Sequence, residues 1–152
     1  MNTIATATLR AAFAEAIRGI TPTAEPLRSI GWSYTPSSRS GGRALVKPAT
    51  RNFDLTFTRT APTHRWVGGR GTAYATRLAV TTSYAGIEPE TRDHVIAEDA
   101  VDIHRALRRL INTPALDGLC EIEFTGQSAE RGGSDSFAVD HTFLVHYHQA
   151  TR

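Results

Sequence analysis

Residues 72–110 read TAYATRLAVTTSYAGIEPETRDHVIAEDAVDIHRALRRL, and this stretch decides the fold because two different hydrophobic periods follow each other in it. Between Thr72 and Tyr84, apolar side chains alternate with small or polar ones. One face of this segment consists of Tyr74, Leu78, Val80 and Tyr84, and the other of Ala75, Arg77, Ala79, Thr81 and Ser83. A period of two predicts a β-strand with one buried face.

The hydrophobic period changes after Pro89. Apolar residues then recur at spacings of four, three, four and three, at Ile96, Ala100, Ile103, Leu107 and Leu110. This spacing predicts an amphipathic helix over Glu90–Asn112 with a single apolar stripe. Its acidic residues lie toward the start and its arginines toward the end, as the helix dipole favours. Thr113-Pro114 is expected to end the helix.

The segments before residue 72 predict one more helix and two more strands. A helix is expected over Thr3–Gly19, and Pro22 follows it. Gly31–Tyr34 is a short strand candidate, and Phe53–Thr58 alternates as a strand with one apolar face does. The apolar stripe of the first helix consists of Leu9, Phe13 and Ile17.

Two further strands are expected after the second helix, at Leu119–Gln127 and Phe137–Gln149. The order is therefore helix, three strands, helix, two strands. Because strand-to-strand connections dominate, we predict an α+β fold with a mostly antiparallel sheet and both helices packed on one of its faces. The length of 152 residues favours a single domain over the whole chain, 1–152.

Two long polar loops are expected, at Pro36–Thr50 and at Arg59–Gly71. Loops of this length in a compact domain are usually functional or disordered. We expect them to become ordered against neighbouring protein, with Trp66 as an apolar anchor. The predicted interface residues in and around these loops are Arg39, Arg43, Lys47, Arg65, Trp66 and Arg70. The same arginines with an aromatic ring also leave open a contact with nucleic acid.

The net charge of +2 conceals an uneven distribution. Residues 26–87 contain nine basic residues and one acid, whereas residues 88–152 contain six basic residues and twelve acids. The basic middle and the acidic C-terminal part are therefore expected to attract each other, within one copy or between copies.

The sequence predicts no catalytic, cofactor-binding or metal-binding residue. The glycines at 68–71 lack the Lys-Ser/Thr ending of a phosphate-binding loop, and no Gly-x-Ser-x-Gly motif is present. His146 and His148 share one face of a strand and His141 lies on the other, without a third ligand at a known zinc spacing. Cys120 is the single cysteine and is interpreted as a small buried hydrophobic residue.

No apolar run approaches the roughly 20 residues of a membrane-spanning helix. Met1–Gly19 also lacks the basic start and continuous apolar core of a signal peptide. We therefore expect a protein that is made and used in a cytoplasm-like compartment, without a membrane partner.

The whole layout resembles the tail-terminator proteins of long-tailed bacteriophages, also called tail-completion or minor tail proteins. The resemblance lies in an amphipathic helix at the start (Leu9-Arg10-Ala11-Ala12-Phe13), a long polar loop after an early strand, and a long strand ending near Tyr84. A helix containing Ile103-His104-Arg105-Ala106-Leu107 then precedes two closing strands. The similarity covers most of the chain but contains no specific motif.

The resemblance implies a structural virion subunit in a hexameric ring that caps the tail tube and joins the tail to the head. It implies no catalysis and no cofactor. The implied partners are further copies of the chain, the tail tube protein and a head-side connector, with DNA at most passing through the ring. Another neck subunit, a small ligand- or nucleic-acid-binding α+β domain, and an enzyme with unrecognised chemistry remain alternatives.

Overall fold

The strand expected at Thr72–Tyr84 is β3 (Gly71–Ala85), and it lies inside a six-stranded sheet in the computed structural model. The structure describes residues 6–23, 31–34, 50–65, 71–116, 118–128, 131–132 and 136–150. The other strands are β1 (Ser33–Tyr34), β2 (Thr50–Arg65), β4 (Leu119–Gln127), β5 (Arg131–Gly132) and β6 (Ser136–Ala150).

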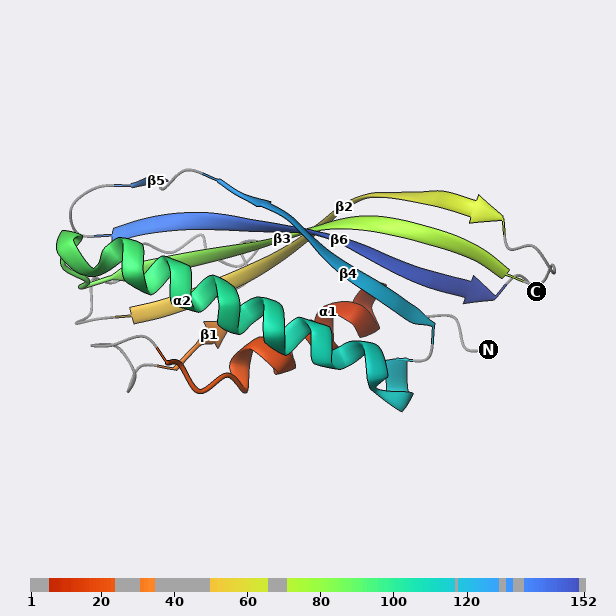
Figure 1. Ribbon diagram of the computed structural model, residues 1–152, viewed down its shortest axis with the longest axis horizontal. Helices are drawn as coiled ribbons and strands as arrows, with labels where there is room; N and C mark the ends of the chain where they lie inside the picture. Colours follow the sequence, from red (N-terminus) through yellow and green to blue (C-terminus); the bar gives the residue numbers. More distant parts are fainter. Residues whose placement is uncertain are drawn as a thin grey trace.

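The strands follow each other across the sheet in the order β1-β2-β3-β6-β4, and β5 pairs with β6 beyond the end of β4 (Figure 1). All pairings are antiparallel except that of β1 with β2, which is parallel. Figure 1 shows both helices on the same side of this sheet. The predicted fold class is therefore confirmed: a mostly antiparallel sheet with two helices, in the order α-β-β-β-α-β-β, with the two-residue β5 added between the last two strands.

Both predicted helices are present. The first, α1, spans Thr6–Arg18; residues 3–5 of its predicted range lie outside the described residues. The second, α2, spans Pro89–Arg108. Pro89 occupies the first turn, where a backbone N–H would have no partner within the helix, so proline loses no hydrogen bond there. The last four residues of the predicted range form the 3₁₀ helix η2 (Arg109–Asn112), and a second 3₁₀ helix, η3 (Pro114–Leu116), follows.

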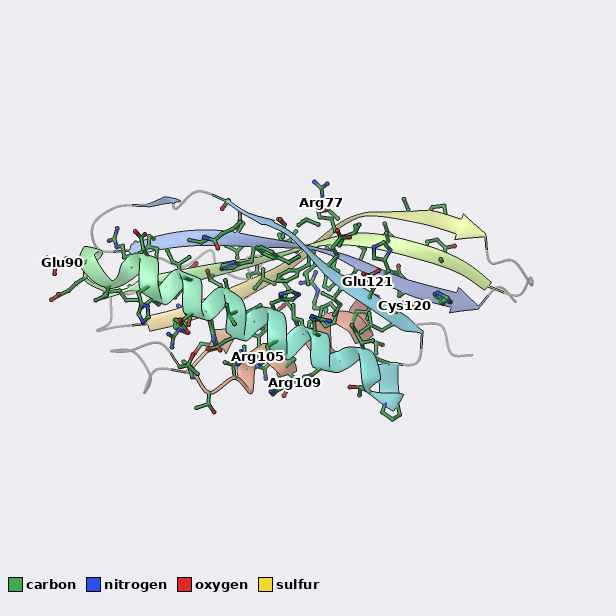
Figure 2. All side chains as sticks on the ribbon, in the orientation of Figure 1. Arg77, Glu90, Arg105, Arg109, Cys120 and Glu121 are labelled. Carbon is green, nitrogen blue, oxygen red and sulfur yellow. The ribbon has the colours of Figure 1, made fainter. Side chains whose placement is uncertain are left out.

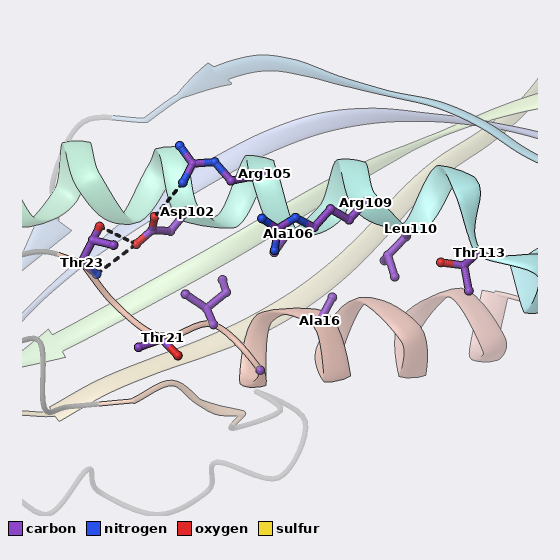
Figure 3. Close-up of a pocket in the computed structure, with 11 residues that line it drawn as sticks. Ala16, Thr21, Thr23, Asp102, Arg105, Ala106, Arg109, Leu110 and Thr113 are labelled. Carbon is purple, nitrogen blue, oxygen red and sulfur yellow. Dashed lines mark hydrogen bonds and ion pairs between the residues drawn. The ribbon is translucent and has the colours of Figure 1, made fainter.

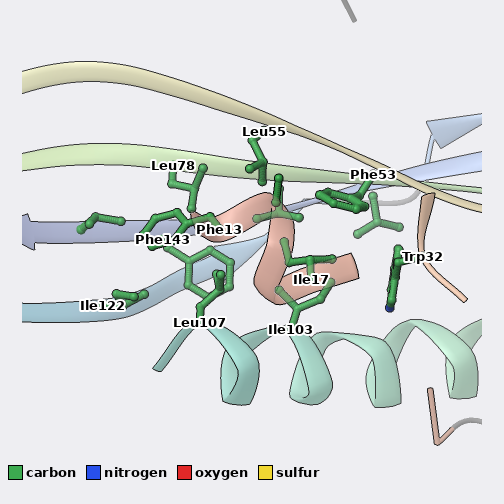
Figure 4. Packing of buried hydrophobic residues seen from close by; sticks show 14 of the residues in the cluster. Phe13, Ile17, Trp32, Phe53, Leu55, Leu78, Ile103, Leu107, Ile122 and Phe143 are labelled. Carbon is green, nitrogen blue, oxygen red and sulfur yellow. The ribbon is translucent and has the colours of Figure 1, made fainter. Parts of the chain in front are cut away.

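The core lies between the helices and the sheet (Figure 4). The six positions predicted to be buried all expose at most 6% of their surface, and they are Leu9, Phe13, Ile17, Ile96, Ile103 and Leu107. Opposite them, the sheet contributes inward-facing residues such as Leu55, Leu78 and Phe143. Each large apolar side chain buried in this way contributes roughly 1.5–3 kcal/mol to folding.

The second predicted loop is wrong in its first half. Residues 59–65 continue β2, and Gly71 already belongs to β3, so that only 66–70 lie between the two strands. Pro62 suggested a loop because proline cannot donate to a strand ladder. It is accommodated because the pairing of β2 with β3 shifts between Thr58 and Ala61 and again between Pro62 and His64, on the outer strand of this part of the sheet.

The face of the sheet opposite the helices carries mostly polar and small side chains. Arg77 is exposed there, as expected for its parity in β3, and Figure 2 shows it pointing away from the helices. His146 and His148 are half-buried and alternate with the buried Val145 and Tyr147, so they lie on this same open face. No helix in the described part of the chain is long and apolar enough to cross a membrane.

Candidate functional site

Five of the six predicted interface residues fall outside the described residues: Arg39, Arg43, Lys47, Trp66 and Arg70. The sixth, Arg65, is the last residue of β2, where its backbone pairs with Thr72. The first predicted loop, 36–50, is described only at Thr50, which begins β2. The role of these residues in an interface therefore stays a prediction.

A buried ionic network joins α2 to the sheet. Arg51 of β2 donates from Nε to Oδ2 of Asp99 at 2.8 Å and from Nη2 to Oδ1 at 3.1 Å. The hydroxyl of Tyr84 donates to the same Oδ2 at 2.8 Å. The Arg51 guanidinium also lies over the ring of Trp32, 5.2 Å from its centroid.

Neither side chain of the Arg51–Asp99 pair exposes any surface. Burial raises the pKa of the Asp99 carboxyl, and the charge of Arg51 opposes this rise. Burial and the nearby Asp99 charge also raise the pKa of the Tyr84 hydroxyl well above its ordinary value. Because solvent does not reach these groups, the arrangement fits a structural clamp between β2, β3 and α2 better than a reactive site.

A groove lies between the end of α1 and the side of α2 that faces it (Figure 3). Its volume is about 470 Å³, and its walls include the small residues Ala16, Gly19 and Ala106. Asp102 of this groove accepts hydrogen bonds from the backbone N–H and the hydroxyl of Thr23, at 3.3 and 3.0 Å. The carboxylate is thus already engaged in holding the chain that leaves α1.

An apolar patch is exposed where α2 meets β4. Val101 exposes 52% of its surface and Phe124 exposes 40%, the two large hydrophobic side chains exposed among the described residues. The ring of His104 lies 6.0 Å from that of Phe124 and 5.8 Å from that of Phe143. Burial in this contact and the charge of Arg108 lower the pKa of His104, which favours its neutral form.

The remaining histidines do not converge. His141 is buried under the helices; burial lowers its pKa to about 4, and its Nε2 lies 3.3 Å from the hydroxyl of Thr82. His146 lies on the open face, 4.0 Å from the carboxylate of Glu123. No group of three or more metal-ligating side chains occurs among the residues that the structure describes.

The interpretation of Cys120 as a buried residue is wrong, because it is exposed. It lies at the register shift between Leu119 and Glu121, where β4 contains one residue more than its partner β6. Such a bulge turns the extra side chain out of the alternation. The thiol contacts the carbonyl oxygen of Gly118 at 3.1 Å, and burial of part of the group raises its pKa.

The chain matches no protein-family model and no curated protein sequence.

Two of the features above were missed in the sequence. The Arg51–Asp99 pair joins residues 48 positions apart, and nothing local to either residue indicates the other. The exposed patch could have been predicted in part, because Val101 is an apolar residue that lies off the predicted apolar stripe of the second helix.

Proposed function

We propose that this protein is a structural subunit that assembles with copies of itself into a ring. The observation that carries the proposal is a long sheet whose outer strands, β2 and β4, have edges that are largely without a neighbouring strand among the described residues. Its central strands, β3 and β6, each contain 15 residues, so these edges are long. A polar sheet face can stay in water, whereas an open strand edge is a surface on which another copy can assemble.

The nature of the ring is taken from the resemblance to phage tail terminators. The order of elements on which that resemblance was based agrees with the observed fold. We infer a hexameric ring in the neck of a virion that caps the tail tube and joins the tail to the head. Its partners in that role are other copies of the chain, the tail tube protein and a head-side connector.

The buried titratable groups support a structural role over an enzymatic one. Arg51, Asp99 and Tyr84 are used in a clamp without access to solvent. Asp102, the acid in the groove between the helices, holds Thr23. These groups are all engaged in contacts that hold elements of the fold together.

The mass of the native protein in solution tests the proposal. Sedimentation velocity over a range of concentrations is expected to show a concentration-dependent closed assembly, and electron microscopy is expected to show rings. Added tail tube protein should bind one end of the ring. A chain that stays monomeric at every concentration, with and without tube protein, overturns the proposal. A ring that binds only head-side proteins favours a different neck subunit.

A further inference from the structure

Within the described part of the chain, the two outer strands of the sheet have long edges without a neighbouring strand. On one side, β1 pairs only with Asn52 and Phe53, so the rest of β2 has no strand beside it among the described residues. On the other side, β4 pairs with β6 alone in that same part of the chain. An unpaired edge presents free N–H and C=O groups and is a template for another strand.

The two edges lie at the same level of the sheet. Following the pairing from strand to strand, Leu55 of β2 lies in one row with Gln127 of β4, through Val80 and His141. The row of Pro62 leads in the same way, through Tyr74 and Tyr147, to Leu119. Residues 55–62 of β2 and residues 119–127 of β4 therefore form the two ends of the same rows of paired residues across the sheet.

The two edges also run in opposite directions, because three successive antiparallel pairings separate β2 from β4. A second copy placed by rotation about an axis along the strands brings its β2 beside β4 of the first copy in an antiparallel orientation. All helices then stay on one side of the continuous sheet. Contacts of this head-to-tail kind close into rings when the rotation divides the circle.

Part of the β2 edge is already occupied by the chain itself. The N–H of Leu55 donates to the carboxylate of Asp54 at 2.8 Å, and its carbonyl oxygen accepts from Arg10 of α1 at 2.6 Å. The edge available to another strand therefore begins at Thr56, and it is interrupted at Pro62, which has no N–H to donate, and at the register shifts beside it.

The charges of the two edges are complementary. Residues 56–65 contain Arg59 and Arg65 and no acid, whereas β4 contains Glu121 and Glu123 and no basic residue. Both glutamates are exposed. Pairing β4 with β4 of another copy would bring glutamates together, and like charges across a strand pair are destabilising. Pairing β4 with β2 joins an acidic segment to one whose sequence contains basic residues and no acid.

The helices support the same arrangement. On the helix side, α1 lies against β2, where Phe13 stacks on Phe57 at 5.9 Å. The exposed Val101 and Phe124 lie at the other side, next to β4. Joining β4 to β2 of a neighbour brings the neighbour's α1 toward this apolar patch.

We propose that β4 of one copy pairs with residues 56–65 of β2 in the next copy, so that one sheet continues from subunit to subunit. This inference rests on the proposed ring and names the surface that closes it. The helices form one wall of the assembly, and the open faces carrying Arg77 form the other.

Cross-linking tests the pairing, because Cys120 already lies on β4 and is the single cysteine. Cysteine is introduced at one exposed β2 position at a time, as Thr60→Cys or Ala61→Cys, because these positions lie level with Cys120 in the rows of the sheet. Thr56→Cys lies level with Gly126 and is expected to give no cross-link. Mild oxidation is expected to give a ladder of dimer, trimer and larger products with at least one variant, because a disulfide forms only when the two Cα atoms come within about 7 Å. Adding Cys120→Ser should abolish the ladder.

The matched control is Arg77→Cys, which is exposed but lies on the central strand β3. It is expected to give no ladder. An equal ladder from this control, or disulfide dimers of the unaltered protein through Cys120, overturns the proposed pairing.

Charge reversal tests the same contact without cross-links. Glu121→Arg with Glu123→Arg is expected to raise the subunit concentration needed for half-assembly by about tenfold or more. Combining this pair with Arg59→Glu and Arg65→Glu should restore assembly, which also shows that the variants fold. The control pair Glu90→Arg with Asp93→Arg makes the same charge change on exposed residues of α2 and is expected to leave assembly unchanged.

The outcomes separate this inference from the proposed function. If Glu121→Arg with Glu123→Arg still forms rings normally, and no β2 cysteine cross-links to Cys120, the ring closes through another surface. This result overturns only the strand pairing. An unaltered chain that never assembles overturns both.

Discussion

Arg51 and Asp99 form a two-point ion pair in which neither side chain is exposed, with N–O distances of 2.8 and 3.1 Å. The pair connects the start of β2 to the middle of α2, and Tyr84 adds a third strand-to-helix bond. A charge buried in this way depends on its partner, because removing one member leaves the other without water or counter-charge.

Asp99→Ala is therefore expected to lower the free energy of unfolding by about 3–5 kcal/mol. Glu98→Ala, at the half-buried neighbouring position of α2, should change it by less than about 0.5 kcal/mol. Urea denaturation followed by circular dichroism measures both. Equal stability of the two variants would show that the Arg51 charge finds another partner.

Replacing all three members by apolar residues, as Arg51→Met and Asp99→Leu with Tyr84→Phe, is expected to recover most of the stability lost in Asp99→Ala. Buried ion pairs are often matched in stability by apolar residues of similar volume, and Tyr84→Phe removes the hydroxyl that would otherwise lose its acceptor. A triple variant as unstable as the single one would show that the network has a further role in positioning β2.

Gly132→Ala is expected to destabilise the protein by about 1–3 kcal/mol. Gly132 has φ of 129°, a conformation that side-chain-bearing residues rarely adopt. An added Cβ would also clash with the carbonyl oxygen of Ser136 and would lie 2.8 Å from Cα of Phe137. Gly31→Ala is the control, since its Cβ would meet nothing within 4 Å. Thermal unfolding of the two variants distinguishes a local backbone requirement from a general intolerance of alanine.

The hydrophobic periods predicted the helices and most of the sheet because they are local properties of the chain. Leu9, Phe13 and Ile17 must lie on one side of a helix, and that side must be buried. The predictions failed where partner strands decide the outcome. Cys120 leaves the alternation at a bulge, and Pro62 is tolerated because β2 has no described strand on its outer side there. The Arg51–Asp99 pair depends on tertiary distance and has no periodic signal.

Stability is expected to fall as the pH decreases from about 6.5 to about 4, partly because of His141. Burial lowers the pKa of this histidine from 6.5 to about 4 in the folded state, so the unfolded chain binds its proton more readily. Stability therefore rises with pH across this window and is fully present above it. The effect of this one group amounts to about 3 kcal/mol.

His141→Gln should remove this part of the pH dependence, whatever it does to stability at neutral pH. His94→Gln, at an exposed position of α2, should leave the dependence unchanged. Unfolding free energies measured between pH 4 and pH 7 test both variants. An identical slope in His141→Gln and in the unaltered protein would assign the acid sensitivity to other groups.

Leu107 and Val101 lie six residues apart on α2 and are expected to respond oppositely to an introduced charge. Leu107 is fully buried against the sheet, so Leu107→Asp places an unpaired charge in the core, costs several kcal/mol and should prevent folding. Val101 exposes 52% of its surface, so the free energy of unfolding of Val101→Asp should lie within about 0.5 kcal/mol of that of the unaltered protein.

If the patch of Val101 and Phe124 meets a neighbouring copy, the same Val101→Asp subunit should nevertheless assemble poorly, because the contact would bury its charge. Circular dichroism and sedimentation velocity on one preparation measure the two properties separately. A Val101→Asp protein that folds and assembles like the unaltered chain would remove this patch from the subunit contact, and a Leu107→Asp protein of unchanged stability would contradict the observed packing of α2 on the sheet.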